Sequence, residues 1–176
     1  MSAKFVWLSI FFLHFFGKEL PARAVDSGWR KPNMEQFTGD WRLSSSNRYL
    51  SVIEDFDGDG KRDRCTIMTN VKKGEWGIRV NFADEKTSWL PISGKYQSPE
   101  WKEDFERNRG IKVGKQGRYK TACGKGYWEC DKVAGDMPDV EIRNAGIILF
   151  RNEAGGTVLF YWNSKLGKFD SQVLDD

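Results

Sequence analysis

The sequence predicts a mainly β protein: a β-rich α+β domain, built as an antiparallel sheet or meander with one short helix. Three observations lead to this fold class. Runs of alternating apolar and polar residues are bounded by glycine-containing turns, the chain holds 8 tryptophans, and helical periodicity is confined to one stretch. An acidic loop, described below, is expected between two strands of the meander.

Residues 1–24 have the layout of a secretory signal peptide. Lys4 precedes an apolar run from Phe5 to Phe16, and the segment then ends in the small-residue pattern Ala22-Arg23-Ala24. A membrane anchor is the alternative, but the apolar run is shorter than the ~20 residues that a spanning helix needs. We therefore expect a periplasmic or secreted protein, with residues 25–176 forming a single β-rich domain and no membrane span after cleavage.

The amino-acid composition limits the catalytic groups, metal sites and partners that the protein is expected to have. The only histidine, His14, lies inside the predicted signal peptide. The mature chain would then lack the side chain that most often acts as a general base, activates a nucleophile or binds zinc. The formal net charge of the whole chain is only +3, which does not favour a nucleic-acid partner. We therefore expect a protein that is not an enzyme.

The expected β elements follow from hydrophobic periodicity and turn residues. Residues 25–48 are polar and poorly periodic, with a short strand expected near Trp41. A hairpin and third strand are expected over residues 49–82, with strands at Tyr49–Glu54, Arg64–Thr69 and Trp76–Phe82. Residues 110–176 are expected to hold the cysteine segment and C-terminal hairpins, with strands at Arg118–Ala122, Ile147–Arg151, Thr157–Trp162 and Lys168–Leu174.

One helix is predicted, over residues 98–109. Ser98 is a suitable N-cap, and Gly110 is a suitable residue to end the helix. Trp101 and Phe105 are four residues apart, so both side chains would face the sheet.

The segment Asp55–Asp63 carries the sharpest chemical signal. Its sequence, DFDGDGKRD, places carboxylates at relative positions 1, 3, 5 and 9 and glycine at position 6. Calcium takes six to eight oxygen ligands, and this spacing lets one short turn surround a single ion. Magnesium is the alternative ion, although it requires stricter octahedral geometry. The expected ligands are the carboxylates of Asp55, Asp57, Asp59 and Asp63 and the backbone carbonyl of Lys61.

The flanks of this loop distinguish it from an EF-hand. An EF-hand needs a glutamate at loop position 12, where this chain has Thr66, and helices on both sides. The loop instead resembles the calcium loop of FG-GAP and VCBS-type repeats, in which Asp-x-Asp-x-Asp-Gly-x-x-Asp lies between strands of a β-sheet. The resemblance covers residues 49–82 and implies a structural calcium ion that ties two strands together.

The three cysteines predict one disulfide, because thiols are oxidised in the compartments that exported proteins reach. Cys123 and Cys130 are separated by six residues, glycines among them, and are the favoured pair. Cys65 would then be a small buried residue. A bridge from Cys65 to one of the other two cysteines is the alternative.

A second resemblance extends over most of the mature chain. The segment from Tyr119 to Cys130, together with Phe160-Tyr161-Trp162 and the closing stretch 169–176, resembles a group of small uncharacterised exported bacterial proteins, in which a similar acidic loop comes first. This resemblance implies a common domain but no activity.

We therefore expect an exported calcium-binding module that is a binding or structural protein. The first alternative is a periplasmic inhibitor or immunity protein against a cell-wall enzyme or toxin, and the second is a carbohydrate-binding module. A glycosidase using carboxylates such as Glu141 and Glu153 is a further alternative. The candidate surface for an unknown protein or glycan partner comprises Lys125, Tyr127, Trp128 and Trp162.

Overall fold

The computed structural model describes residues 28–90, 92, 99–153 and 155–175, and within the helix it describes side chains from Glu103 onwards. The predicted signal peptide, the predicted cap Ser98 and the side chain of Trp101 lie outside these described parts. Within the described residues, no helix is both long and apolar enough to cross a membrane.

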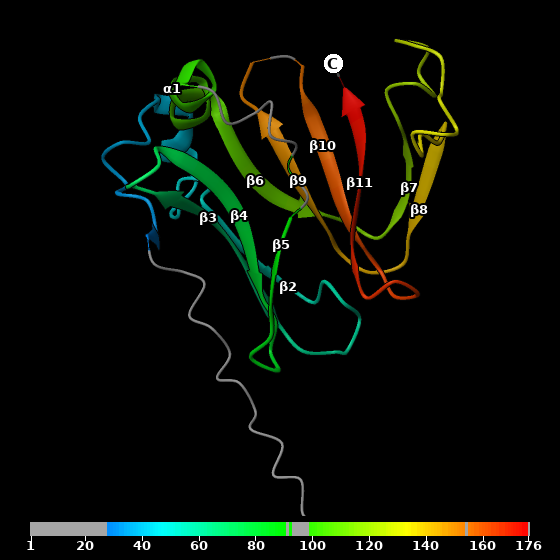
Figure 1. Cartoon of the computed structure of the whole chain (residues 1–176), viewed down its shortest axis with the longest axis horizontal. Coiled ribbons are helices and arrows are strands. Elements are labelled where there is room, and N and C mark those ends of the chain that lie inside the picture. The colour runs from blue at the N-terminus through cyan, green and yellow to red at the C-terminus, as the bar shows by residue number, and fades with distance from the viewer. Residues whose placement is uncertain (1–27, 91, 93–98, 154, 176) are drawn as a thin grey trace, which may run out of the picture.

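The described chain forms three antiparallel β layers (Figure 1). Sheet A has the order β1-β3-β4-β5, with β2 also paired to β3, and its strands are β1 Trp29–Arg30, β2 Ser51–Glu54, β3 Asp63–Asn70, β4 Glu75–Asn81 and β5 Thr87–Trp89. Sheet B has the order β11-β10-β9-β6, with β6 Arg109–Gly114, β9 Gly146–Arg151, β10 Thr157–Asn163 and β11 Lys168–Asp175. The third layer is the pair of β7 Gly117–Lys120 and β8 Asp139–Ile142. The mainly β class and the antiparallel pairing are as the sequence predicts.

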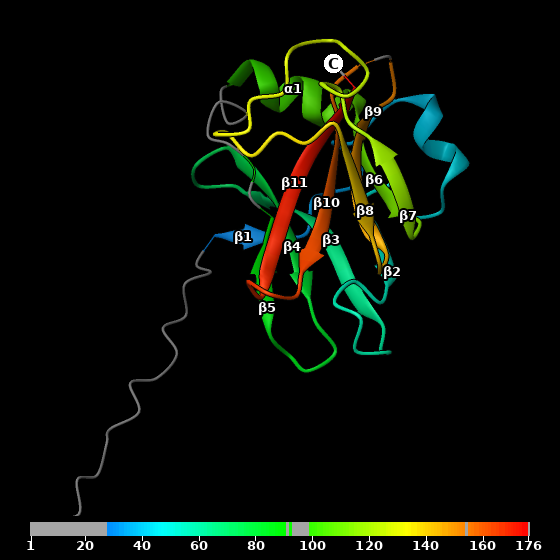
Figure 2. The ribbon, with the colours of Figure 1, turned by 90° about the vertical axis from the view of Figure 1, so that its right-hand side faces the viewer.

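Sheet B is the middle layer and is buried on both faces (Figures 1 and 2). Ile147 and Leu149 of β9 join the core shared with sheet A, whereas Ile148 between them joins a second core with Val140 and Ile142 of β8. Successive side chains of a strand point to opposite faces. The unbroken apolar run of β9 therefore contributes side chains to both hydrophobic cores.

The core between sheets A and B holds the residues that sequence periodicity places on one face of each strand. Cys65 and Ile67 of β3 and Ile78 of β4 are fully buried there. Helix α1, Pro99–Asn108, covers one end of this core, and its Phe105 stacks on Trp76 with ring centroids 3.5 Å apart. The prediction that Phe105 faces the sheet is confirmed.

Two local predictions are wrong. The short strand expected near Trp41 is a 3-10 helix, Asp40–Ser44, whose Trp41 ring stacks on Tyr49 at 5.3 Å between centroids. Gly110 does not end the helix, because α1 ends at Asn108 and Gly110 is a buried residue of β6. A Cβ at Gly110 would lie 2.7 Å from the Cβ of Tyr49, so glycine is needed there for close packing.

Arg42, and not a glycine, provides hydrogen-bond donors for the backbone carbonyls at the C-terminal end of α1. It is fully buried, and its guanidinium donates to the backbone carbonyls of Phe105 at 3.3 Å, Glu106 at 3.0 Å and Arg109. The last carbonyls of a helix have no partner within the helix, and the helix dipole favours a cation there. Burial, and then repulsion from Arg48, lowers the pKa of Arg42 to about 10. Arg42 therefore remains charged at neutral pH and joins the N-terminal segment to α1.

We predict that Arg42→Met destabilises the protein by about 3 kcal/mol, because the substitution leaves several buried carbonyls without a donor. Urea denaturation followed by circular dichroism measures this. Arg64→Met is the matched control, since Arg64 is exposed on β3 and its loss should cost less than about 0.5 kcal/mol. Equal effects of the two substitutions would contradict the role given to Arg42.

Candidate metal centre

The acidic loop joins β2 to β3 at the end of the molecule opposite α1 (Figures 1 and 2). The two strands are antiparallel, and Glu54, just before the loop, lies opposite Asp63 at its end. Strands rather than helices therefore flank the loop, as its sequence context predicts. This is the arrangement of a β-hairpin loop and not of an EF-hand.

Three carboxylates converge inside the loop. Asp55, Asp57 and Asp63 each offer an oxygen atom, and these atoms lie within 4.8 Å of one another. Calcium–oxygen bonds are about 2.3–2.6 Å long, so two oxygens that share one ion can be at most about 5 Å apart. The three side chains are thus placed to bind one cation together.

Asp63 fixes the loop to the body of the protein. The residue is 1% exposed, and its Oδ2 accepts the backbone N–H of Phe56 at 3.0 Å. Its Oδ1 accepts the backbone N–H of Ala83, just beyond β4, also at 3.0 Å. Phe56 is itself fully buried in the core. Because a carboxylate has about four acceptor positions, Asp63 keeps capacity for a cation.

Hydrogen bonds within the loop bring the other carboxylates inward. The Asp55 carboxylate accepts the backbone N–H groups of Gly58 at 2.7 Å and Gly60 at 2.9 Å. Asp57 accepts the N–H of Asp59 at 3.1 Å. Gly58 and Gly60 both have φ of 83°, in the left-handed region that favours glycine. The glycines therefore allow the turn, and the backbone donors orient the acids.

Asp59 does not join this cluster, although the sequence predicts it as a ligand. Its Oδ1 accepts the backbone N–H of Lys61 at 2.8 Å, and its Oδ2 lies 3.8 Å from Lys61 Nζ. Both residues are exposed to solvent. The structure thus brings together three of the four predicted carboxylates, and the role of the Lys61 carbonyl stays a prediction.

The carboxylates of the loop repel one another. Burial raises the pKa of Asp57 above its ordinary value, and a hydrogen bond from the Asp59 N–H acts against this. The charges of Asp63, Asp59 and Asp55 then raise the Asp57 pKa further. A bound cation would reverse this repulsion, because a nearby positive charge favours the ionised form.

Comparison of the chain with protein-family models, with curated proteins and with solved structures gives no match. The resemblance of the loop to FG-GAP and VCBS-type repeats stays a prediction.

The sequence gives no indication of one neighbour of the loop, Asn144. This residue lies in the turn between β8 and β9, and its side chain packs against Gly58 so closely that a Cβ on Gly58 would lie 2.5 Å from Asn144 Nδ2. The acidic loop of sheet A therefore touches the turn that leads from the β7–β8 layer into sheet B. Residues so far apart in sequence cannot be paired from local patterns.

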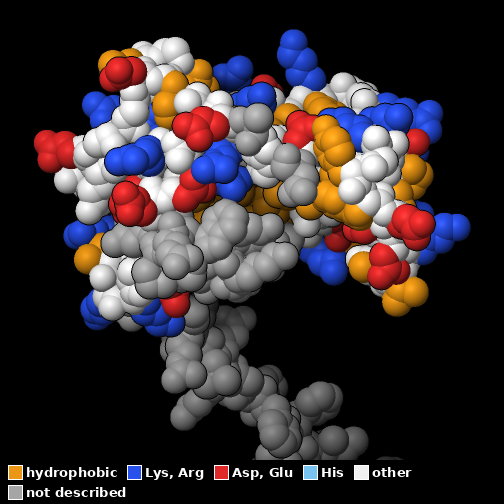
Figure 3. Space-filling view, turned by 90° about the horizontal axis from the view of Figure 1, so that it is seen from above, with side chains coloured by type: hydrophobic (Ala, Val, Ile, Leu, Met, Phe, Trp, Pro, Cys, Tyr) orange, Lys and Arg blue, Asp and Glu red, His pale blue; other side chains and the backbone are white. Residues whose placement is uncertain are grey.

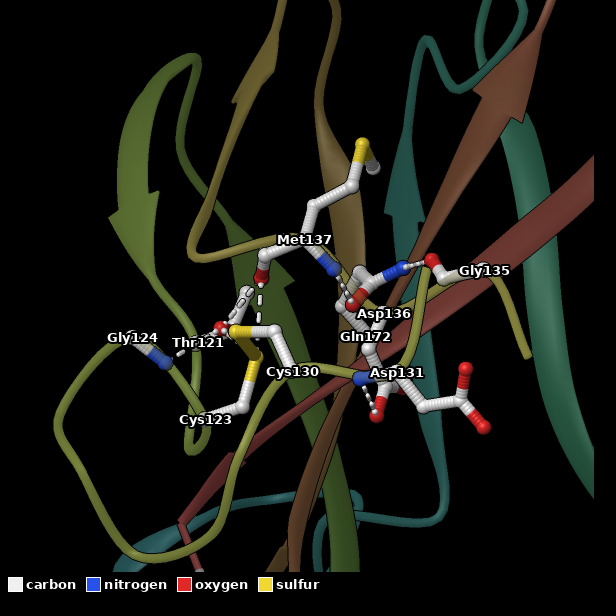
Figure 4. The surroundings of a disulfide bond; sticks show 9 residues. All are labelled: Thr121, Cys123, Gly124, Cys130, Asp131, Gly135, Asp136, Met137 and Gln172. Carbon is white, nitrogen blue, oxygen red and sulfur yellow. Dashed lines mark hydrogen bonds between the residues drawn. A yellow bond between two sulfur atoms is a disulfide. The ribbon is translucent and has the colours of Figure 1, made fainter. Parts of the chain in front are cut away.

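The predicted disulfide Cys123–Cys130 is present (Figure 4). Cys65 is buried and free. The alternative pairings through Cys65 are therefore wrong. The segment that follows the disulfide loop is bonded to β11, where the Gln172 side chain accepts the N–H of Met137 at 3.4 Å and donates to the carbonyl of Gly135 at 3.0 Å.

The predicted binding surface is divided between two ends of β11. Tyr127 and Trp128 are exposed on the disulfide loop, and Lys125 Nζ is 2.6 Å from Asp175 near the end of β11. Trp162 instead packs against Phe169 at the start of β11. A strand rises about 3.3 Å per residue, so the two groups are roughly 20 Å apart. Figure 3 views the end with the disulfide loop, where charged side chains of both signs surround hydrophobic ones.

The two carboxylates considered for a glycosidase are also apart. Glu141 lies near the end of β8, before the turn that leads into the start of β9. Glu153 lies beyond the other end of β9, and its carboxylate is 4.0 Å from the Arg151 guanidinium. The length of β9 is about 20 Å by the rise of a strand. Glycosidase carboxylates are about 5–10 Å apart, so this pair does not meet the requirement.

We predict that Gly58→Ala is more harmful than Gly60→Ala, although both glycines have the same positive φ. Among the residues that the structure describes, and apart from the two chain neighbours of Gly60, no atom lies within 4 Å of the position that a Cβ on Gly60 would occupy. Its substitution therefore adds only backbone strain of about 1 kcal/mol. Gly58→Ala also forces the end of the Asn144 side chain to move, which costs up to about 1 kcal/mol more. Thermal and urea denaturation measure both changes.

The double variant Gly58→Ala with Asn144→Ala is the control for this contact. It should remove the excess cost of Gly58→Ala and leave only the cost seen for Gly60→Ala. If Gly58→Ala and Gly60→Ala cost the same, the loop does not pack against Asn144 as described.

Proposed function

We propose that the chain is an exported calcium-binding β-rich module, which acts by binding or by structural support and not by catalysis. The observation that carries the proposal is the convergence of Asp55, Asp57 and Asp63 in one hydrogen-bonded loop. The carboxylates are held by backbone donors before any ion binds, so little ordering is needed on binding.

The donor set favours calcium among the metals. All three side chains offer oxygen, and neither histidine nor thiol lies in the cluster. Hard cations such as calcium and magnesium prefer such ligands, whereas softer metals prefer nitrogen and sulfur. Calcium accepts more oxygens in a less regular geometry than magnesium does. Three carboxylates with one backbone carbonyl and water would complete its shell.

A structural role follows from what the loop touches. It joins β2 to β3, bonds through Asp63 to Ala83 just beyond β4, and packs on Asn144 in the β8–β9 turn. A cation that removes repulsion among the acids would therefore stabilise several elements at this end of the molecule.

An inhibitor or immunity protein is the second candidate, and the disulfide loop is the observation that favours it. Tyr127 is 56% exposed and Trp128 is 37% exposed on this covalently closed loop. Aromatic anchors presented on a rigid segment are typical of protein interfaces. Calcium binding and a partner on this loop are compatible, because the two regions are at opposite ends.

We predict that calcium raises the melting temperature. Extracellular calcium modules bind with Kd of about 0.1–1 mM, and about 10 mM calcium at a Kd of about 0.1 mM adds about 2.7 kcal/mol. For a domain of this size, that corresponds to roughly 5–10 °C. Isothermal titration calorimetry gives the affinity, and scanning calorimetry gives the shift.

Asp57→Asn tests the assignment to the loop, with Asp84→Asn as the matched control. Asp84 is an acid in the neighbouring β4–β5 turn and pairs with Lys86 at 2.6 Å. Calcium binding should weaken at least about 10-fold in the first variant and stay unchanged in the second. Absence of both heat and a melting shift in the unmodified protein would rule out the proposed function.

A further inference from the structure

The end of the molecule with the acidic loop also has two polar hollows, one on each side of the β8–β9 turn. The larger, about 420 Å³, lies between this turn and the β10–β11 turn. The smaller, about 360 Å³, lies between the same turn, the acidic loop and the β6–β7 turn. Small-molecule sites are commonly about 300–1,000 Å³, so both hollows are of that size. The larger one is distinguished by two aromatic residues in its lining, Tyr161 and Trp162.

Trp162 gives the larger hollow an aromatic wall of fixed orientation. Its ring is half-buried and makes edge-on contacts with Phe82 and Phe169, each at 5.2 Å between centroids. Because neighbouring rings hold the indole in place, little side-chain entropy is lost when a ligand packs on it.

Three polar side chains around this wall have unused hydrogen-bonding capacity. In the part of the chain that the structure describes, Glu141, Arg143 and Asn144 line the hollow and have no hydrogen-bond or ion-pair partner for their side chains. The amide of Asn163, by contrast, is already bonded to Asp170 at 2.6 Å. A carboxylate accepts, a guanidinium donates, and an amide does both. The hollow therefore offers both kinds of partner beside one aromatic face.

We propose that this hollow binds an oligosaccharide of neutral hexose or N-acetylhexosamine units. A pyranose ring has an apolar C–H face that packs on an indole and hydroxyl groups that both donate and accept. The mixture of Glu141 with the cations Arg143 and Lys165 gives no single-sign field that would favour a strongly charged ligand. The proposal does not rest on calcium binding, because none of these residues belongs to the acidic loop.

The test is a titration of the ¹⁵N-labelled full domain, watched by NMR, with chitotetraose, cellotetraose and maltotetraose as separate probes at up to about 10 mM. At least one sugar should shift the indole N–H signal of Trp162 and the side-chain amide of Asn144 in a saturable way. The indole signal of Trp128, at the other end of the molecule, should not move.

Two substitutions complete the experiment. Glu141→Gln should weaken sugar binding about 5–10-fold, and Glu153→Gln, an exposed carboxylate beyond the other end of β9, should leave it unchanged. Both variants should keep the melting temperature and the calcium affinity, which separates this proposal from the calcium site. Failure of all three sugars to shift Trp162, shifts confined to Trp128, or equal effects of the two variants would each overturn the proposal.

Discussion

The two-sided burial of sheet B is the constraint on which the rest of the structure depends. Ile147 and Leu149 face one core and Ile148 the other, so each face of the sheet must be covered by a separate layer. Sheet A covers one face and the β7–β8 pair covers the other (Figure 1). The β8–β9 turn, which connects the third layer to the middle one, contacts the acidic loop of sheet A through Asn144 and Gly58. The candidate metal loop and the polar hollows are therefore neighbours as a result of layer packing.

Most of the long strands could be predicted from the sequence because their signals are local. β9 and β10 are apolar runs, and the turns at Gly155-Gly156 and Gly167 separate β9, β10 and β11. All three of these glycines have positive φ. The short strands β1, β5 and β8 carry too few residues for a pattern. Arg42 could not be predicted at all, since burial of a cation depends on carbonyls that α1 supplies far along the chain.

The candidate metal site likewise has features that the local sequence predicts and features that depend on tertiary packing. The spacing of Asp55, Asp57 and Asp63 is local, so the cluster could be predicted, but Asp59 turns instead toward its own Lys61. The contact of Asn144 with Gly58 and the separation of Trp162 from the disulfide loop depend on how the layers are stacked. Local spacing thus predicts most of the acidic cluster, whereas tertiary packing decides what surrounds it.

The most direct test of the central claim is a crystal structure of residues 25–176 grown with about 10 mM calcium, with anomalous diffraction data to locate the ion. The account predicts one calcium ion in the loop, bound by oxygens of Asp55, Asp57 and Asp63 at about 2.3–2.6 Å. Crystals in which the loop keeps the same shape but holds no ion, or in which calcium binds only elsewhere, would contradict it.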